Sequence, residues 1–225
     1  MENRYLRNIP AITPAQQEIL KSKRAAVIGC GGLGGYIIEF LTRFGIGHIT
    51  ACDGDVFDET NLNRQILATE STIRKPKVLE AMQRAKIIDS SIDFNAVYAY
   101  FSDENAETIL NGCDIVMDAL DSGKARIALE KACAERELTI VHGAISEYSS
   151  QVCVVPPKSG ILTQLFYGRE DSKSKTSLSY IPPYCASIQC AEALKILLGE
   201  TPTLIGKLLI CDLNSYDTDI IQLQR

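Results

Sequence analysis

The stretch VIGCGGLGG, residues 27–35, decides the fold, because a short apolar run leads directly into five glycines. Residues 29–34 match the pattern G-x-G-x-x-G. Between a strand and a helix, such a turn lets main-chain N–H groups approach a phosphate, and the positive end of the helix favours the anion. We therefore predict a nucleotide-binding turn formed by Gly29, Gly31, Gly32 and Gly34. A redox cofactor and an ATP consumed in an activation reaction both suit this turn, so the pattern leaves the nucleotide open.

The rest of the chain places this turn in an α/β domain. Apolar runs of strand length alternate with helical patterns up to about residue 145, as βαβ units do. We expect one of these helices to begin at Thr13 as its N-cap, with Pro14 as its first residue, and the helix after the glycine turn to end at Gly45. After that point short strands joined by turns follow, among them GILTQLFYG at 160–168, which we expect as a strand, with one helix at 185–199. We predict one domain over 1–225, a Rossmann-like, mostly parallel sheet flanked by helices. Residues 1–145 form its nucleotide-binding half, and residues 146–225 continue the sheet with antiparallel strands.

Composition excludes several classes of protein. The 23 basic residues against 28 acidic ones give a net charge of −5, which argues against nonspecific binding to nucleic acid or to an anionic membrane. The sequence lacks an apolar run long enough to span a bilayer and a secretory signal, so we expect a soluble, cytoplasmic protein. The eight cysteines form no C-x-x-C pair, so we expect no structural zinc and mostly buried, reduced thiols.

Polar residues after the second strand narrow the choice of nucleotide. Asp53 ends that strand, where a carboxylate accepts hydrogen bonds from a ribose. Arg64 and Lys77 follow, and two cations there suit a triphosphate better than a redox cofactor. Hydride transfer also needs a proton donor near the substrate, and the chain has two histidines, each of which we interpret as structural. The candidate nucleotide ligands after this strand are Asp53, Asp55, Asn61, Arg64, Gln65 and Lys77.

A second acidic pair follows a later strand, in DIVMDALDSGKAR. Asp118 and Asp121 lie at the carboxyl end of that strand, the edge at which α/β sheets bind ligands. A carboxylate there is well placed to hold Mg²⁺ against phosphates, and Asp121 alternatively caps the helix that follows. The polar stretch 168–179 is predicted to be a loop, either functional or a plain surface segment.

These motifs together resemble those of a known family. The run RYLRNI, VIGCGGLGG, CDGDVFDETNLNRQ, RKPK, DALDSGKAR and VHGAISEYSSQV is similar to the ThiF/MoeB/HesA family, the bacterial relatives of ubiquitin-activating enzymes, in the family's order and spacing. The resemblance implies an adenylyltransferase that uses ATP and Mg²⁺. Its substrate would be the C-terminal glycine carboxylate of a small β-grasp sulfur-carrier protein of the ThiS or MoaD type, with release of pyrophosphate. The pathway would be sulfur transfer for thiamin or molybdopterin biosynthesis.

The resemblance also implies roles for individual residues. The four glycines shape the phosphate-binding turn, Asp53 holds the ribose, and Asp55 and Asn61 line the nucleotide pocket. Arg64 and Lys77 contact the phosphates and stabilise the transition state. Asp121 binds Mg²⁺, and Arg126 supports the site from its helix. Arg7 matches an arginine that family members insert into the neighbouring subunit's site, which implies a homodimer.

The carrier is implied to dock on the 146–225 half, with its Gly-Gly tail beneath the 168–180 loop. Many members carry two C-x-x-C pairs for zinc, which this chain lacks, and its 168–180 loop has no cysteine. Cys185 is the nearest thiol and a candidate nucleophile, with a buried helix-end residue as the alternative. Without a nucleophilic cysteine the reaction would stop at the acyl-adenylate.

Three other functions remain open from the sequence. A related dehydratase would adenylate a carboxylate on tRNA, which the acidic composition disfavours. A nicotinamide-dependent oxidoreductase would use the glycine pattern alone, and a non-catalytic homologue would not need Arg64, Lys77 and Asp121 together. The sequence decides neither the pathway nor the sulfur donor.

Overall fold

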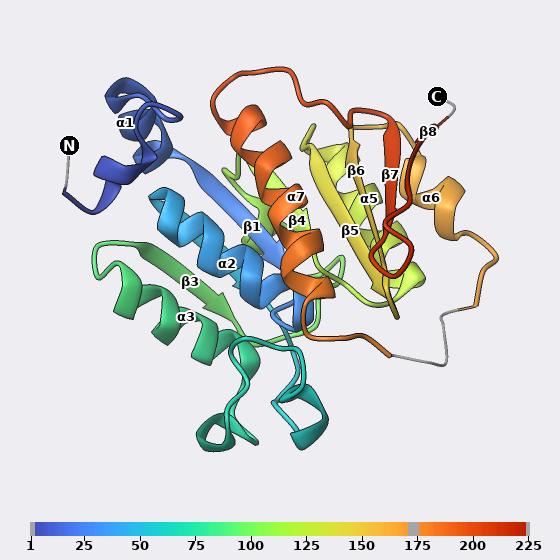
Figure 1. The fold of residues 1–225 in the computed structure, drawn as a ribbon, viewed down its shortest axis with the longest axis horizontal. Coiled ribbons are helices and arrows are strands. Elements are labelled where there is room, and N and C mark those ends of the chain that lie inside the picture. The colour runs from blue at the N-terminus through green and yellow to red at the C-terminus, as the bar shows by residue number, and fades with distance from the viewer. Residues whose placement is uncertain (1–2, 171–175, 224–225) are drawn as a thin grey trace.

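The computed structural model describes residues 3–170 and 176–223, and its centre is one eight-stranded sheet (Figure 1). The strand order is β3-β2-β1-β4-β5-β6-β7-β8, with the first five parallel and the last three antiparallel. The predicted fold class is therefore confirmed. The strands are β1 (Arg24–Ile28), β2 (His48–Cys52), β3 (Asp93–Val97), β4 (Ile115–Asp118), β5 (Ile140–Ser146), β6 (Ser149–Val155), β7 (Lys207–Asp212) and β8 (Thr218–Gln222).

Helices cover both faces of the sheet. They are α1 (Pro14–Ser22), α2 (Gly32–Phe44), α3 (Lys77–Ile88), α4 (Ala106–Leu110), α5 (Gly123–Glu135), α6 (Ile161–Phe166) and α7 (Ile181–Leu197). Helices α2, α3 and α7 pack on the face that Figure 1 turns toward the viewer, and α4, α5 and α6 pack on the other. Three short 3-10 helices complete the described chain: η1 (Asn3–Asn8), η2 (Glu59–Asn61) and η3 (Glu70–Thr72).

The apolar side chains of β1 show why the sheet is buried on both faces. Ala25 and Val27 point into the core under α2 and α7, whereas Ala26 and Ile28 point into the core under α4 and α5. All four are completely buried. A continuous apolar run of this kind is what a central parallel strand requires. The carboxyl ends of these strands are thereby held at a common edge, where the candidate site lies.

Two predicted helix boundaries follow from local chemistry. Thr13 caps α1 with a reciprocal Thr13–Gln16 capping box, and Pro14 is its first residue. At the end of α2, Gly45 takes the left-handed conformation with φ of 82°, and its N–H bonds back to the last turn. Both ends were predicted from the sequence and are confirmed.

The prediction of a strand at 160–168 is wrong, because residues Ile161–Phe166 form the helix α6. Its N-terminus is stabilised by the buried Glu130 of α5, whose carboxylate accepts the main-chain N–H groups of Leu162 at 2.9 Å and of Thr163 at 2.8 Å. The Thr163 hydroxyl donates to the same carboxylate at 2.7 Å. A partner from another helix thus overrides the local strand pattern, as tertiary contacts often do.

Among the described helices, none is both long and apolar enough to cross a membrane. The predicted loop at 168–179 connects α6 to α7, and residues 171–175 of it lie outside the described part of the chain. Helix α7 begins at Ile181, four residues before the predicted start, with Pro182 and Pro183 in its first turn. Proline is favoured there because the first N–H groups of a helix have no partner within it.

Candidate active site

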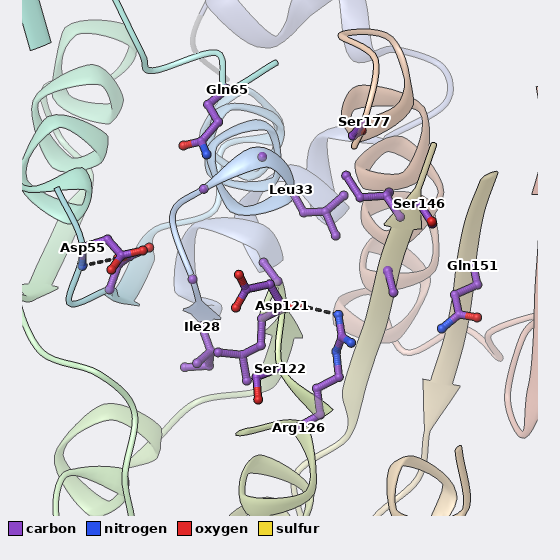
Figure 2. Close-up of a pocket in the computed structure, with 18 of the residues that line it drawn as sticks. Ile28, Leu33, Asp55, Gln65, Asp121, Ser122, Arg126, Ser146, Gln151 and Ser177 are labelled. Carbon is purple, nitrogen blue, oxygen red and sulfur yellow. Dashed lines mark hydrogen bonds between the residues drawn. The ribbon is translucent and has the colours of Figure 1, made fainter. Parts of the chain in front are cut away.

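A cavity of about 550 Å³ opens at the carboxyl ends of the parallel strands and continues across β5, β6 and β7 (Figure 2). This edge is where ligands bind in open α/β sheets. Residues from the glycine turn, from the segments after β2, β3 and β4, and from the β5–β6 hairpin line it. The cavity therefore joins the two predicted halves of the chain in one site.

The four predicted glycines divide into two pairs with different roles. Gly29 has φ of 99°, and a Cβ added to it would lie 2.6 Å from the Ala119 carbonyl oxygen. A Cβ on Gly34 would lie 1.8 Å from the Gly29 carbonyl oxygen, so this pair lets α2 pack against the turn. Gly31 and Gly32 line the cavity, as Gly29 does, but a Cβ on either of them would have no atom nearer than about 3.6 Å. Gly31 and Gly32 thus leave open the space that a phosphate at this helix N-terminus would fill.

Asp53 holds the glycine turn in place. One oxygen of its carboxylate accepts the main-chain N–H of Cys30 at 2.6 Å, and the other accepts that of Asp55 at 2.7 Å. Burial raises the pKa of this carboxyl group, an effect that the two main-chain bonds oppose. Asp53 lines the cavity, so the predicted contact with a ribose adds to a structural role that the sequence did not reveal.

Asp55 brings a cation and a phenol together beside the glycine turn. Lys77, the first residue of α3, is buried, and its Nζ lies 3.0 Å from Asp55 Oδ2. The Tyr100 hydroxyl donates to Asp55 Oδ1 at 2.6 Å, and this bond raises the pKa of Tyr100. Tyr100 was missed by the sequence analysis. The available signal was its place just after β3, at the same sheet edge as Asp53.

Arg64 and Gln65 lie above the glycine turn, and Asn61 does not reach the cavity. The Arg64 Nη1 donates to the Thr60 carbonyl at 2.9 Å and to Asn63 Oδ1 at 2.8 Å, while the side chain lines the cavity. The buried Oε1 of Gln65 has no hydrogen-bond partner among the residues that the structure describes. Asn61 is buried in η2, where its Oδ1 accepts the Asp58 N–H at 3.3 Å, and it is absent from the lining.

The two acidic residues after β4 have different surroundings. Asp121 is exposed at the cavity wall, on the same side as Ser122 (Figure 2). Asp118 is fully buried, and its carboxylate accepts the Leu120 N–H at 3.0 Å and faces His142 Nδ1 at 2.7 Å. Asp118 is thereby occupied by protein donors, and Asp121 remains the acidic candidate ligand of this pair.

Arg126 of α5 lies between two parts of the cavity, one beside the glycine turn and one over the β5–β6 hairpin. Its Nη2 donates to the Leu120 carbonyl oxygen, its Nε lies 3.5 Å from Asp118 Oδ2, and its guanidinium carbon is 4.7 Å from the centre of the Phe166 ring. The side chain is 7% exposed and lines the cavity (Figure 2). These contacts fix a positive charge at the point where the two parts meet.

The second part of the cavity is a slot over the β5–β6 hairpin. Its floor carries mostly small side chains, and the segment that follows residue 175 pairs with the tip of the hairpin and borders the slot. The Glu147 N–H donates to the Thr176 carbonyl at 2.9 Å, and Asn63 Nδ2 donates to the Ser177 carbonyl at 3.2 Å. The floor residues are Ala144, Ser146, Ser149, Ser150, Gln151 and Ile210. The sequence analysis singled out none of these side chains, since none carries a charge.

The site fits a nucleoside triphosphate with a magnesium ion. The cradle at Gly31 and Gly32, the unpaired Gln65 oxygen and the cations Arg64 and Lys77 suit a polyanion. Among residues 3–170 and 176–223 no three acidic, histidine or cysteine side chains cluster to form a metal cage. Mg²⁺ usually keeps several water ligands and also binds the phosphates, so it needs only one or two carboxylates from the protein. Asp121 alone would therefore suffice at a phosphate site.

Besides Asn61 and Gly34, two more predicted site residues lie outside the cavity lining. Arg7 is exposed on η1, next to the buried Tyr5, whose hydroxyl donates to Asp89 at 2.8 Å. Tyr5 lies at the amino ends of β2 and β3, the sheet edge opposite to the cavity. Cys185 is fully buried in α7, and burial raises the pKa of its thiol well above the usual range, which disfavours a nucleophile.

The fold and site define an α/β protein in which a glycine turn that suits a phosphate opens into a slot over the β5–β6 hairpin. Solved structures share this architecture: E. coli MccB with ATP matches with a TM-score of 0.84 at 20% identity, over 100% of this chain and 72% of that one. This likeness concerns the fold. The chain belongs to the ThiF family, whose profile matches residues 3–225.

Curated relatives carry names of the same enzyme class. SAMP-activating enzyme E1 of Haloferax volcanii is 30% identical over 93% of this chain and 81% of its own length. Sulfur carrier protein adenylyltransferase of Thermus thermophilus is 31% identical over 93% of this chain and 83% of its own. Adenylyltransferase and sulfurtransferase MOCS3 of Culex quinquefasciatus is 35% identical, and the match spans half of it. The prediction of an E1-like adenylyltransferase is confirmed at the level of the family.

Proposed function

We propose that this chain adenylates the C-terminal glycine carboxylate of a small β-grasp sulfur-carrier protein, in sulfur transfer of the thiamin or molybdopterin type. The observation that carries the proposal is the single cavity that joins the cradle at Gly31 and Gly32 to the slot over β5 and β6. An ATP in the cradle and a peptide tail in the slot would meet beside Arg126. The Thermus thermophilus relative is named for the same kind of substrate.

The chemistry explains why cations surround this meeting point. A carboxylate oxygen of the tail attacks the α-phosphorus, the bond to the β-phosphate breaks, and pyrophosphate leaves with the electron pair. Two anions must approach each other, so positive charge is needed where negative charge builds up. Arg64, Lys77 and Arg126 all line the cavity. Removal of one such contact typically costs about 2–4 kcal/mol of transition-state stabilisation.

Lys77 and Asp121 have separate roles in this proposal. Lys77 now lies 3.0 Å from Asp55 and would exchange that partner for a phosphate. Asp121 would hold Mg²⁺, which supplies positive charge beside the phosphate oxygens.

The slot favours a thin peptide tail. Its floor includes Ala144, Ser146, Ser149 and Ser150, and the segment around Ser177 borders it. A Gly-Gly end has no side chains to accommodate in such a space. We therefore assign the carrier body to the surface at the mouth of the slot, on the 146–225 half of the chain.

The active form is proposed to be a homodimer in which Arg7 completes the partner's site. Tyr5 is 4% exposed and tied to Asp89, so η1 is anchored at the sheet edge opposite to its own cavity. Arg7 itself is exposed on this anchored segment. From there it serves a neighbouring copy and not its own ATP.

The reaction of this chain is proposed to end at the acyl-adenylate. Seven of the eight cysteines are buried, and the eighth, Cys113, is half-buried just before β4, at the amino-terminal end of that strand. Burial raises the pKa of the Cys113 thiol to about 11. A thiol in that state is a poor nucleophile at neutral pH, so the sulfur would have to come from a donor outside this chain.

Carrier-dependent exchange of labelled pyrophosphate into ATP tests the proposal. Purified protein, Mg²⁺ and a panel of β-grasp carriers ending in Gly-Gly are combined, and we expect exchange with one carrier. Arg64→Ala and Asp121→Ala should each reduce this exchange at least about 100-fold. Arg43→Ala, which removes a surface arginine from the end of α2, should leave it unchanged. Tight ATP binding without exchange for any carrier would contradict the proposal and favour another carboxylate substrate.

A further inference from the structure

The chain has two histidines, and both pair with an aspartate through Nδ1. His48 pairs with Asp93 at 2.9 Å and is partly exposed at the amino end of β2. His142 pairs with Asp118 at 2.7 Å, and both side chains have zero exposure. His142 contacts Gln151, which lines the cavity. The proposed chemistry gives this buried histidine no role.

The surroundings of His142 fix the place of its proton. Burial lowers the pKa of His142, an effect that the bond to Asp118 opposes, so the ring is neutral at physiological pH. Asp118 accepts from Leu120 N–H and faces the Arg126 guanidinium, so its carboxylate acts as an acceptor toward the ring. The proton of the neutral ring is therefore on Nδ1, and Nε2 carries a lone pair.

This lone pair orients the amide of Gln151. The Nε2 atoms of His142 and Gln151 lie 3.4 Å apart, so the Gln151 amide group donates to the ring. The opposite orientation would set the carbonyl oxygen of Gln151 against the lone pair of the ring. With its NH₂ turned to His142, Gln151 has its Oε1 free of the ring, and the side chain lines the cavity (Figure 2).

Arg126 is held at the cavity wall by the Asp118 carboxylate, which also faces His142. Its Nε lies 3.5 Å from Asp118 Oδ2, and the Phe166 ring contacts both the guanidinium, at 4.7 Å, and the His142 ring, at 5.5 Å. The charged groups that face His142 are Asp118 of β4 and Arg126 and Glu130 of α5. The cavity wall thus contains both an oriented amide and a fixed positive charge.

An acceptor and a cation in the wall of one cavity are complementary to an acylglycine, whose N–H and carboxylate are separated by one methylene group. We propose that His142 is a positioning residue that orients Gln151 so that Gln151 Oε1 accepts the last peptide N–H of the incoming tail, with Arg126 beside its carboxylate. This inference rests on the proposed function. It assigns the selectivity for a terminal glycine to the Gln151 side chain, which binds a main-chain N–H of the tail.

A carrier that lacks only this N–H provides the test. The carrier that supports exchange is prepared by semisynthesis in two forms, ending in Gly-Gly or in Gly-glycolate, where an ester oxygen replaces the last N–H without added bulk. The kcat/KM for each form is measured by pyrophosphate exchange with four proteins. These are the parent chain, Gln151→Met, His142→Asn and the matched control His48→Asn. In His142→Asn the shorter side chain still donates to Asp118 but does not reach Gln151.

The ratio of the two kcat/KM values is the readout. We expect the parent and His48→Asn to lose about tenfold with the glycolate form, since a buried acceptor is left unpaired. Gln151→Met and His142→Asn should lose less than about twofold, because no oriented acceptor remains. If the role of His142 were merely structural, His142→Asn would lower kcat/KM for both carrier forms and leave their tenfold ratio intact. That result would overturn the inference and leave the proposed function standing. No exchange by the parent with the Gly-Gly form would overturn both.

Discussion

Glu130→Gln removes one negative charge from the base of α6 without changing the shape of the side chain. Glu130 is 5% exposed, and one of its oxygens accepts the Leu162 N–H while the other accepts the N–H and the hydroxyl of Thr163. The amide of a glutamine keeps one oxygen, which retains the two Thr163 bonds. Its NH₂ group then faces the Leu162 N–H, so that donor is left unpaired.

The expected loss of unfolding free energy is about 3 kcal/mol. A hydrogen bond to a charged group contributes about 1.5–3 kcal/mol, and an unpaired buried donor costs a similar amount. The two bonds that remain are weaker because they are no longer charge-assisted. For a chain of this length, about 3 kcal/mol lowers the melting temperature by about 6–12 °C.

Urea unfolding and thermal melting of the full chain measure this change. Glu137→Gln is the matched control, because Glu137 pairs with Lys158 at 2.8 Å and both side chains are largely exposed. Its loss should stay below about 1 kcal/mol. Hydrogen exchange of the Thr163 and Leu162 amides should rise in Glu130→Gln. Equal unfolding free energies for Glu130→Gln and Glu137→Gln would refute the claim that the Glu130 carboxylate stabilises α6.

Four other predictions concern the site. Gly34→Ala places a methyl group 1.8 Å from the Gly29 carbonyl oxygen and should lower the unfolding free energy by about 3 kcal/mol. Gly32→Ala should leave urea unfolding within about 1 kcal/mol of the parent and weaken ATP binding measured by calorimetry, because its methyl group enters the cradle. Lys77→Met should lower kcat/KM for ATP in pyrophosphate exchange about 100-fold, and a loss below threefold would contradict a phosphate contact. The pKa of His142 is lowered in the folded chain, so the unfolded chain binds more protons. The unfolding free energy should therefore fall as the pH drops below about 6.5, and His142→Asn should lack this part of the pH dependence.

The sequence predicted the parts of the fold that local chemistry determines. The glycine turn, the cap at Thr13 and the left-handed Gly45 are local signals, and the structure has each where it was expected. Helix α6 was missed because its stabilising partner, Glu130, lies 32 residues from Leu162 and belongs to another helix. A six-residue apolar segment carries too little pattern to separate a helix from a strand.

The sequence predicted those parts of the candidate site that carry charged side chains. Arg64, Lys77, Asp53 and Asp121 line one cavity, although they come from four separate segments. The slot was not predicted, because alanine and serine side chains carry no chemical signature and only the pairing of β5 with β6 brings them together.

His142 is a further case. As a lone histidine at the end of an apolar strand it was interpreted as structural, and only the strand register reveals its position between Asp118 and Gln151.

The formation of a carrier-adenylate tests the central claim most directly. The chain is mixed with a Gly-Gly carrier, ATP and Mg²⁺ in a single turnover, the reaction is quenched in acid, and the carrier is weighed by mass spectrometry. The account predicts a carrier heavier by one adenylyl group, absent in Arg64→Ala and absent for a carrier whose last glycine is amidated. A carrier of unchanged mass, with ATP bound at the glycine turn and pyrophosphate not released, would contradict it.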